Sequence, residues 1–275
     1  MKSFGLPDDF IKRDFVAGLA AGLWDQSSMR AEKRKSSAWI LEERRRVWES
    51  KEILRRLYAK WYGLIQEALK PGRTLELGGG SGNLKEFLPE AITTDLVYEP
   101  WLDAVIDAHA LPFRNESLDN LVLFDVLHHL TAPGTFFHEV ERVLNRGGRA
   151  VMMEPYISLA SLPVYRFMHQ EGMRWVANPF WDQWPQRKES FEGNQAIPTL
   201  VFKKYRAEFL RKFPRLHILK AERMDCILYP LSGGFHHRSL CPEPLRKFLE
   251  KVEERMHCLR PLMAFRIFVV VEKSA

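Results

Sequence analysis

The chain has 275 residues, of which 46% are hydrophobic and 28% are charged, the balance of a soluble globular protein with one large domain and additions to it. Its net charge of +6 favours encounter with anionic partners such as nucleic acid, an acidic lipid surface or a phosphorylated substrate, although a solvated basic surface would carry the same charge. The three cysteines, Cys226, Cys241 and Cys258, form no CxxC pair, which argues against a disulfide framework and a zinc site and indicates a reducing compartment.

No segment of the sequence reaches the roughly 20 apolar residues that span a bilayer. The best N-terminal candidate for a targeting segment, Phe15–Trp24, is short and follows acidic residues at Asp8, Asp9 and Asp14. It also lacks a convincing cleavage site. We therefore expect a cytoplasmic protein.

The first 70 residues predict a helical extension. Between Ser36 and Leu69 there is no proline, and Gly63 is the only glycine. Apolar side chains recur there in steps of three, four and seven, as on one face of a helix. The other face interleaves basic with acidic side chains, so a solvated face is a better interpretation than a nucleic-acid-binding arm. Pro71 and Gly72 end the region.

Strands and helices alternate through the rest of the chain. We expect helices at residues 82–88, 135–144 and 244–258, and a glycine-rich helix stop at 145–148. We expect strands at residues 73–78 and 91–96, a short one within 105–113, and others within 117–130, 149–155, 216–231 and 263–273. Such alternation predicts a parallel sheet with helices on both faces.

The stretch over residues 156–214 breaks this regularity, because aromatic residues and prolines crowd into it. It is too long for a simple connection and predicts a functional insertion, a lid with an acceptor pocket. Its rings suit a saccharide, a lipid-linked intermediate or a planar aromatic acceptor, although part of them would simply pack on the sheet.

A glycine-rich loop follows the first expected strand, in the sequence TLELGGGSGN over residues 74–83. It lacks the lysine that a nucleoside triphosphate loop requires. It also lacks the third glycine of a dinucleotide loop, since that position falls at Asn83 or Lys85. The remaining pattern is ExGxGxG, whose acid suits a cofactor with a cationic ammonium and sulfonium and not a pyrophosphate. Its members are Glu76, Gly78, Gly80 and Gly82.

The run from Thr74 to Pro155 resembles the class I S-adenosylmethionine-dependent methyltransferases, in the group similar to the ubiquinone and menaquinone biosynthesis (type 11) enzymes. The matching text is LELGGGSGN, TTD, DAHALPFRNESLDNLVLFDVLHHL and HEVERVLNRGGRAVMMEP, in the family's order. The resemblance implies an α/β fold with a Rossmann-like, doubly wound, mostly parallel seven-stranded sheet. The helical extension would cover residues 1–70 and the methyltransferase domain residues 71–275, with the insertion after the fifth strand.

The resemblance also implies a site for S-adenosylmethionine and its product S-adenosylhomocysteine. Glu76 would lie near the methionine amino group, acting through water, while Gly78 and Gly80 would let the methionyl part lie against the backbone. The predicted site residues are Glu76, Leu77, Gly78, Gly79, Gly80, Asp95, Leu96, Asp107, Ala108 and Phe124.

The ribose and adenine contacts come from later positions. Asp95 matches the acid that takes both ribose hydroxyls, a geometry that suits a carboxylate. Asp107 with Ala108 matches the pair that meets adenine, and the backbone of Phe124 would meet the methionine end. Each aspartate has a structural alternative as a turn or helix cap. The segment between them is compressed, which makes Glu99 a rival to Asp95.

A second departure is in the loop itself, which carries Gly79 and Ser81 where many relatives have cysteine and threonine. This is a mild change, because small residues stand at both positions.

Two histidine pairs are catalytic candidates. His128 and His129 follow the fourth strand, and His128 could act as a base on a hydroxyl, although a structural or cofactor-adjacent role is favoured because relatives with unlike substrates also carry LHHL. His236 and His237 form the second cluster, in a glycine loop where Arg238 could hold an anionic group, unless this is an ordinary surface turn. We expect no metal site, since adjacent histidines lack a carboxylate at helical spacing.

We therefore predict a methyltransferase that acts on a small-molecule, saccharide or lipid-linked acceptor by in-line transfer, in which positioning supplies much of the rate. Peripheral contact with a membrane would fit a lipid-linked acceptor. An RNA methyltransferase is the alternative, but no RNA-binding module and no NPPY or cysteine-pair signature is present. A non-catalytic module that binds the cofactor is the second alternative.

Overall fold

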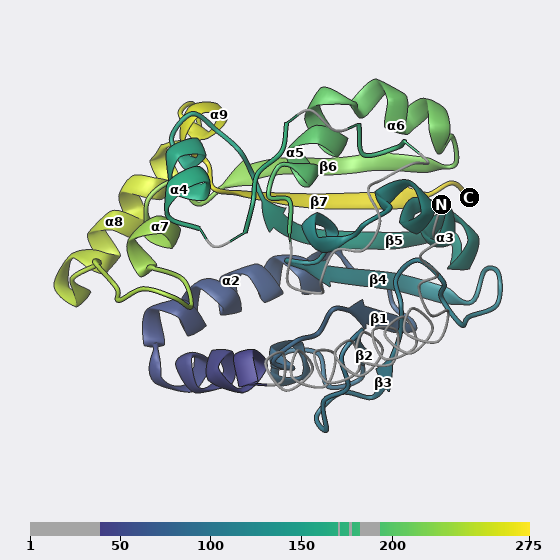
Figure 1. Ribbon diagram of the computed structural model, residues 1–275, viewed down its shortest axis with the longest axis horizontal. Coiled ribbons are helices and arrows are strands. Elements are labelled where there is room, and N and C mark those ends of the chain that lie inside the picture. The colour runs from purple at the N-terminus through teal and green to yellow at the C-terminus, as the bar shows by residue number, and fades with distance from the viewer. Residues whose placement is uncertain (1–38, 170, 176–177, 182–192) are drawn as a thin grey trace, which may run out of the picture.

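The computed structural model describes residues 39–169, 171–175, 178–181 and 193–275 (Figure 1). The N-terminal targeting candidate at residues 15–24 and the first part of the expected helical extension lie outside these ranges. Among the described helices, none combines the length and apolar character needed to cross a membrane.

A seven-stranded sheet forms the centre of the molecule, in the order β3-β2-β1-β4-β5-β7-β6. Strands β1 to β5 pair in parallel, whereas β7 runs antiparallel to both β5 and β6. This confirms the mostly parallel α/β sheet that the sequence predicts. Its strands are β1 (Thr74–Leu77), β2 (Ile92–Asp95), β3 (Ala104–Val105), β4 (Leu118–Phe124), β5 (Leu144–Pro155), β6 (Leu216–Met224) and β7 (Arg266–Lys273).

Both faces of the sheet are covered, which explains the uninterrupted apolar run in β4. Side chains alternate across a strand, so Leu121 and Leu123 face one layer while Val122 and Phe124 face the other. On the first face lie α3 (Pro133–Val143) and α6 (Arg206–Lys212), and on the second lies α2 (Glu52–Ala68) (Figure 1).

The helical N-terminal region is interrupted at Lys51. Residues 39–50 are helical and α2 begins at Glu52, because the backbone of Lys51 adopts φ −107° and ψ 90°, outside the helical region. Helix α2 buries Trp61 completely and stacks Tyr58 on Phe124 of β4, with ring centroids 4.7 Å apart. Burying one large apolar side chain contributes about 1.5–3 kcal/mol, so these contacts hold α2 firmly to the sheet.

Part of the stretch over residues 156–214 packs on the sheet. The ring of Phe137 in α3 contacts Phe209 of α6 and Phe213, with ring centroids 4.9 and 5.6 Å apart. Before α6 come α5 (Ile197–Thr199) and a single π-helical turn, η3 (Leu200–Lys204). Another described part of the stretch, which includes α4 (Ser161–Phe167), lies at the carboxyl ends of the strands.

The helix expected at residues 82–88 is only a short 3-10 turn, η1 (Asn83–Glu86). Gly82 before it has a left-handed backbone with φ 77°, and Pro89 follows closely, so the chain has no room for a longer helix before β2. The expected glycine stop at residues 145–148 is instead part of β5, and the helix expected at 244–258 is α8, which ends three residues earlier.

Four helices gather at one end of the molecule, beside the carboxyl ends of β1 and β4 (Figure 1). These helices are α4, α7 (Leu228–Ser232), α8 (Glu243–Arg255) and α9 (Arg260–Met263). Of the four, α4 and α7 line the crevice in which ligands of open parallel sheets bind. The 3-10 turn η2 (Leu127–His129), directly after β4, lies at the floor of this crevice.

Candidate active site

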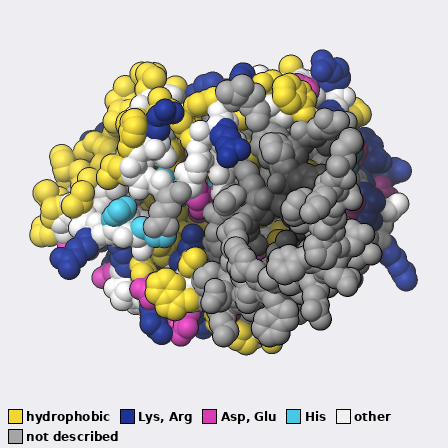
Figure 2. Space-filling model, viewed as in Figure 1, with side chains coloured by type: hydrophobic (Ala, Val, Ile, Leu, Met, Phe, Trp, Pro, Cys, Tyr) yellow, Lys and Arg dark blue, Asp and Glu magenta, His cyan; other side chains and the backbone are white. Residues whose placement is uncertain are grey.

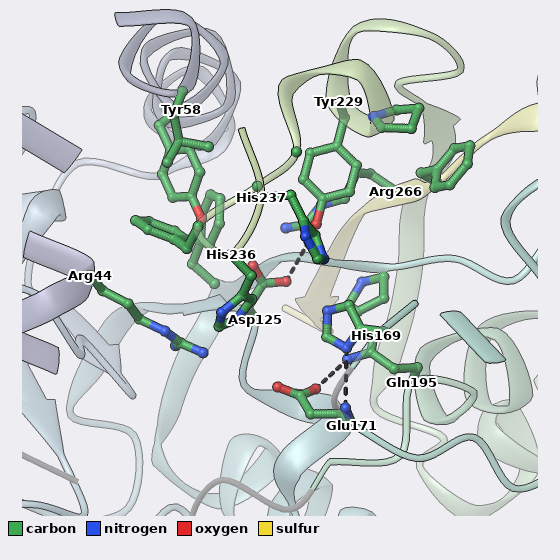
Figure 3. A pocket seen from close by; sticks show the side chains of 18 of the residues that line it. Arg44, Tyr58, Asp125, His169, Glu171, Gln195, Tyr229, His236, His237 and Arg266 are labelled. Carbon is green, nitrogen blue, oxygen red and sulfur yellow. Dashed lines mark hydrogen bonds and ion pairs between the residues drawn. The ribbon is translucent and has the colours of Figure 1, made fainter. Parts of the chain in front are cut away.

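A cavity of about 250 Å³ lies at the carboxyl ends of β1, β4 and β5 (Figure 3). Its walls come from the glycine loop after β1, the segment after β4, α2, the α4 region, α7 with the loop that follows it, and the start of β7. Of the predicted cofactor residues, Glu76, Gly78, Gly79 and Phe124 line it.

Glu76 brings an unpaired carboxylate to one end of the cavity. The side chain is 2% exposed, and within the described chain its Oε2 atom has no hydrogen-bond partner. Burial, and then the negative charge of Asp95, raise the pKa of Glu76 to about 8, against a smaller opposing effect of Lys85. A buried carboxylate of this kind fits the positively charged end of a ligand.

The glycine loop beside Glu76 has no side chains between its backbone and that ligand. Gly78 has φ 69°, and a Cβ atom there would lie 2.3 Å from Cγ2 of Val126. A Cβ atom on Gly79 would lie 2.8 Å from Oε2 of Glu76. A side chain is therefore excluded at Gly78, as the sequence pattern predicts, and Gly79, which the pattern leaves open, is also crowded. A methionyl group can approach the bare backbone.

Asp95 and Glu99 lie close to each other after β2. Asp95 Oδ2 accepts a hydrogen bond from the backbone N–H of Gly80 at 3.0 Å, and its Oδ1 accepts one from the N–H of Val97 at 3.1 Å. Glu99 is buried, its Oε1 has no hydrogen-bond partner in the described ranges, and burial together with Asp95 raises its pKa. The two acids remain rivals for the ribose. The adjacent Leu96 is 54% exposed.

The predicted adenine pair lies outside the enclosed cavity. Asp107 is exposed, and its Oδ1 accepts a hydrogen bond from the backbone N–H of His109 at 2.8 Å, while Nδ1 of His109 lies 2.8 Å from the same oxygen. Ala108 is buried beside it, and Leu77 is buried within β1. An adenine at Asp107 would therefore lie nearer to solvent than the methionine end.

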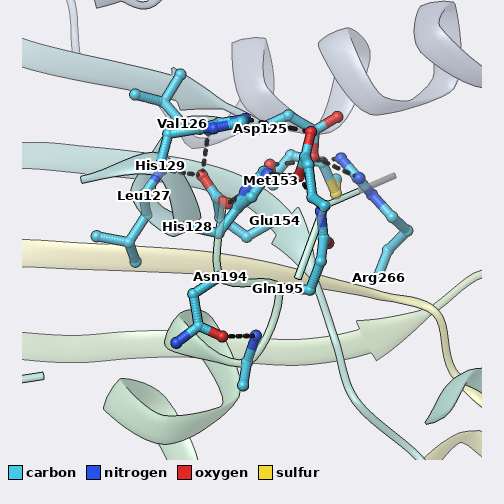
Figure 4. Close-up of polar contacts among 12 residues, drawn as sticks. Asp125, Val126, Leu127, His128, His129, Met153, Glu154, Asn194, Gln195 and Arg266 are labelled. Atoms are coloured by element: carbon cyan, nitrogen blue, oxygen red, sulfur yellow. Dashed lines mark hydrogen bonds and ion pairs between the residues drawn. The ribbon is translucent and has the colours of Figure 1, made fainter. Parts of the chain in front are cut away.

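His128 is enclosed by two carboxylates. Its Nδ1 lies 2.8 Å from Oε2 of Glu154 (Figure 4), and its Nε2 lies 3.0 Å from Oε2 of Glu171. Burial alone would lower the pKa of His128, but the two carboxylates outweigh it and raise the pKa to about 10. The ring is thus an imidazolium at neutral pH, and both of its nitrogens are occupied, which favours the structural role over that of a base.

Glu154, at the end of β5, organises the turn that carries His128. Its Oε1 accepts hydrogen bonds from the backbone N–H groups of Val126 and Leu127, at 2.8 and 2.7 Å. These are donors at the start of the short turn η2, which a carboxylate satisfies well. The preceding residue, Asp125, has a left-handed backbone with φ 57°, which turns the chain sharply out of β4.

Glu171 connects the segment after α4 to this turn. Besides its contact with His128, it accepts a hydrogen bond from Nε2 of Gln195. The backbone N–H of Asn194 in turn donates to the carbonyl of His128 at 2.7 Å. The ion pair with His128 lowers the pKa of Glu171 despite its burial.

Two further imidazoles, His169 and His236, face the cavity from opposite walls (Figure 3). Their ring centroids are 6.5 Å apart. Burial lowers the pKa of His169, and burial together with the charge of Arg44 lowers that of His236, so both rings are neutral at pH 7. The backbone N–H of Glu171 donates to Nδ1 of His169 at 3.3 Å, which places the ring proton of His169 on Nε2.

Arg266, the first residue of β7, closes the inner wall. It is almost fully buried and donates to Oδ1 of Asp125 at 2.5 Å. Its guanidinium lies 5.0–5.3 Å from three ring centroids, which belong to Trp61, Phe124 and Tyr229. Contacts of this kind stabilise a cation within an aromatic environment, so Arg266 fixes the positions of the rings around it.

Among the residues that the structure describes, two groups of side chains have potential metal-ligand atoms within 4.8 Å of one another, and both groups contain His128. One adds His129 and Glu171, and the other adds Asp125 and Glu154. A protonated imidazole has no lone pair to offer a metal, and the pKa of about 10 keeps His128 protonated at neutral pH.

Several of these residues were missed by the sequence analysis. Asp125 and Glu154 stand inside the matching motif text and His169 inside the predicted insertion, but no spacing marks them as site residues. No sequence pattern indicated Glu171 or Arg266 as site residues, because their partners lie far away in the sequence. Of the predicted catalytic residues, His128 and His236 both line the cavity.

Residues 75–152 match a family model described as a methyltransferase domain. No curated protein matches the chain. The matched segment runs from β1 to β5 and so contains the glycine loop, Asp95, Asp107 and His128.

The chain is also similar to several solved structures. One is a chain of the complex that the Trm112 methyltransferase activator of Haloferax volcanii forms, with 15% identity, coverage of 87% of this chain and 97% of that chain, and a TM-score of 0.49. Another is an S-adenosylmethionine-dependent methyltransferase from Archaeoglobus fulgidus, with 13% identity, coverage of 82% and 97%, and a TM-score of 0.48. A third is geranyl diphosphate C-methyltransferase from Streptomyces coelicolor, with 13% identity, coverage of 81% of each chain, and a TM-score of 0.45.

The family match, the order of the sequence motifs and the mostly parallel seven-stranded sheet agree with one another. The unpaired carboxylate of Glu76 and the bare backbone at Gly78 fit the methionine end of the cofactor. Residues 75–152 of this chain therefore form a methyltransferase domain.

Proposed function

We propose that the enzyme methylates an O–H or N–H group of a small acceptor with an apolar body, and that His236 accepts the proton. The observation that carries this proposal is that one continuous cavity is lined by Glu76 and Gly78 and also by His169 and His236. A histidine that accepts a proton must be unprotonated before the reaction. The lowered pKa of His236 meets that condition at pH 7.

The bound cofactor supplies an electrophilic methyl group on a sulfonium. The chain's own residues bind and orient the two reactants, which is where most of the rate enhancement of such a displacement arises. His169 carries its proton on Nε2 and is therefore suited to donate a hydrogen bond to the acceptor, while His236 takes up the acceptor's proton. The rings of Tyr58 and Tyr229 line the cavity and suit an apolar acceptor body.

His236→Gln tests this assignment in an assay of S-adenosylhomocysteine release, with a panel of phenols, long-chain alcohols and amines as acceptors. Loss of a general base lowers kcat by about 10²–10⁴-fold and removes the fall of activity at acidic pH. His257→Gln, an exposed residue of the segment after α8 that does not line the cavity, is the matched control and retains full activity.

Two results would contradict the proposal. If His236→Gln keeps the wild-type pH profile with an active acceptor, no base acts at this position. If the panel yields no product while RNA binds with a steep dependence on salt concentration, the acceptor is RNA.

A further inference from the structure

Large apolar side chains are exposed around one side of the cavity mouth. They belong to α4 with its flanking residues, to the segment before α8, to α8 itself and to the region of α9, and they gather on the left of the space-filling view, beside exposed histidines (Figure 2). We call this set the apolar rim. It consists of Leu159, Phe167, Met168, Leu240, Leu245, Phe248, Leu259 and Leu262, with exposed fractions from 41% to 77%.

The apolar rim is continuous with the cavity. Met168 and Leu240 belong to both, since each lines the cavity and is largely exposed outside it. The backbone N–H of Ala160 donates to the carbonyl of Leu262 at 3.0 Å, which joins the α4 side of the rim to the α9 side. A molecule that leaves the cavity in this direction therefore meets exposed apolar side chains, and gathered exposed apolar side chains often mark an interaction site.

Basic side chains stand among the apolar ones. Within residues 159–169 and 236–262, two acids, Glu243 and Glu254, are exposed, and Glu243 forms an ion pair with Arg246 at 2.8 Å. The exposed bases of the same segments outnumber them, and they are Arg166, Arg238, Lys247, Lys251 and Arg255. The rim thus combines an apolar surface with a positive border.

The mixture of apolar and basic side chains distinguishes between a protein partner and a lipid bilayer as the surface that covers the rim. The cores of protein interfaces are depleted of lysine, whereas α8 exposes Lys247 and Lys251 as well as Leu245 and Phe248. At the surface of an anionic bilayer, apolar side chains enter the acyl boundary while lysines and arginines contact the headgroups.

We propose that the apolar rim docks on the surface of an anionic lipid bilayer and that the cavity receives its acceptor from the lipid phase. The inference rests on the proposed function in one respect, because it narrows the small apolar acceptor to a lipid or a lipid-linked molecule. An acceptor whose tail stays in the membrane passes over Met168 and Leu240 and brings only its head to the methionine end.

Co-sedimentation of the full chain with vesicles tests the docking. Phosphatidylcholine vesicles are compared with vesicles that also contain phosphatidylglycerol, at several salt concentrations. We expect binding to the anionic vesicles that weakens as salt rises. The double variant Phe167→Glu/Phe248→Glu is expected to lower vesicle binding about tenfold or more, because both exposed rings then resist entry into the acyl boundary. Lys247→Glu/Lys251→Glu is expected to remove the preference for anionic vesicles.

The control is Leu210→Glu, an exposed leucine on α6 at the other side of the sheet, which leaves vesicle binding unchanged. All variants are also titrated with S-adenosylhomocysteine, since none of their positions lines the cavity. Wild-type cofactor binding by a variant that has lost the vesicles separates docking from folding and from the proposed function.

Three outcomes overturn the inference. One is the absence of binding to either vesicle by a chain that still transfers methyl groups to a water-soluble acceptor. Another is vesicle binding that survives Phe167→Glu/Phe248→Glu. The third is a dimer that this variant converts into monomers, which would identify the rim as a surface between copies of the chain.

Discussion

Nε2 of His128 lies 3.0 Å from Oε2 of Glu171, and this contact joins the turn after β4 to the segment after α4. On its other side the same ring bonds Glu154 at the end of β5. A single buried imidazolium therefore connects three parts of the chain that line or support the cavity, which gives His128 a positioning role.

We predict that His128→Gln lowers the free energy of unfolding by about 3–5 kcal/mol, the usual cost of removing one partner from a buried ion pair. Because folding raises the pKa of His128 from 6.5 to about 10, its contribution is complete below pH 6.5 and is lost as pH rises through 10. Urea unfolding should show the difference between wild type and variant shrinking over that range. A difference that stays constant with pH would show that the imidazolium is not the stabilising species.

Glu76 predicts a proton release when the cofactor binds. With its pKa at about 8, Glu76 is mostly protonated at pH 7 in the free protein, and it must ionise to face the cationic end of the ligand. Calorimetry of S-adenosylhomocysteine binding in buffers of different ionisation enthalpy should detect the released proton, and affinity should rise with pH up to about 8.

Glu76→Gln should abolish this proton release and weaken binding about 10–100-fold, as expected for the loss of a hydrogen bond to a charged group. Unchanged proton release in the variant would assign the proton to another group.

Asp95 and Glu99 can be separated by the same titration. Asp95→Ala is expected to weaken S-adenosylhomocysteine binding more than tenfold, because it removes the proposed ribose ligand and also frees the backbone N–H of Gly80. If Asp95 holds the ribose, Glu99→Gln should change the affinity less than threefold, which corresponds to less than about 0.7 kcal/mol of binding free energy. The reverse order would assign the ribose to Glu99.

Gly78 and Gly80 form a matched pair in the glycine loop. Both have positive φ, at 69° and 50°, so alanine costs about 1–2 kcal/mol at either position. At Gly78 the added Cβ also meets Val126 at 2.3 Å, whereas at Gly80 the nearest atom, Cδ2 of Leu41, is 3.5 Å away. We expect Gly78→Ala to destabilise the protein by a further ~1–3 kcal/mol in urea unfolding. Equal losses would mean that the β-branched Val126 side chain moves at little cost.

The local patterns of the sequence predicted the sheet well. Continuous apolar runs such as Leu121–Phe124 predict buried strands because each side chain packs on one of two covered faces. The prediction of a helix at residues 82–88 was wrong. The spacing of apolar residues does not show that the segment between Gly82 and Pro89 is too short for more than one turn. The break at Lys51 was also missed, since lysine is a good helix former and the interruption comes from contacts made elsewhere.

The sequence predicted the site residues that belong to recognisable motifs. It did not predict the residues that the fold brings together from distant parts of the chain. Glu76 and Gly78 were found because their spacing has a chemical meaning on its own. Arg266 and Asp125 are 141 positions apart, and they meet only because β7 inserts antiparallel beside β5. His169 lies in a segment without periodicity, so neither its burial nor the partner of its Nδ1 atom was accessible before the fold was known.

Lys51 connects the N-terminal helices to the loop at residues 234–237. It separates the helix at residues 39–50 from α2, and its Nζ donates to the backbone carbonyls of Gly234 and His237, at 2.6 and 2.7 Å. The N-terminal helices and the loop that carries His236 thus share one joint at Lys51. A substitution of Lys51 that removes these two hydrogen bonds would release the loop that carries His236 from the N-terminal helices.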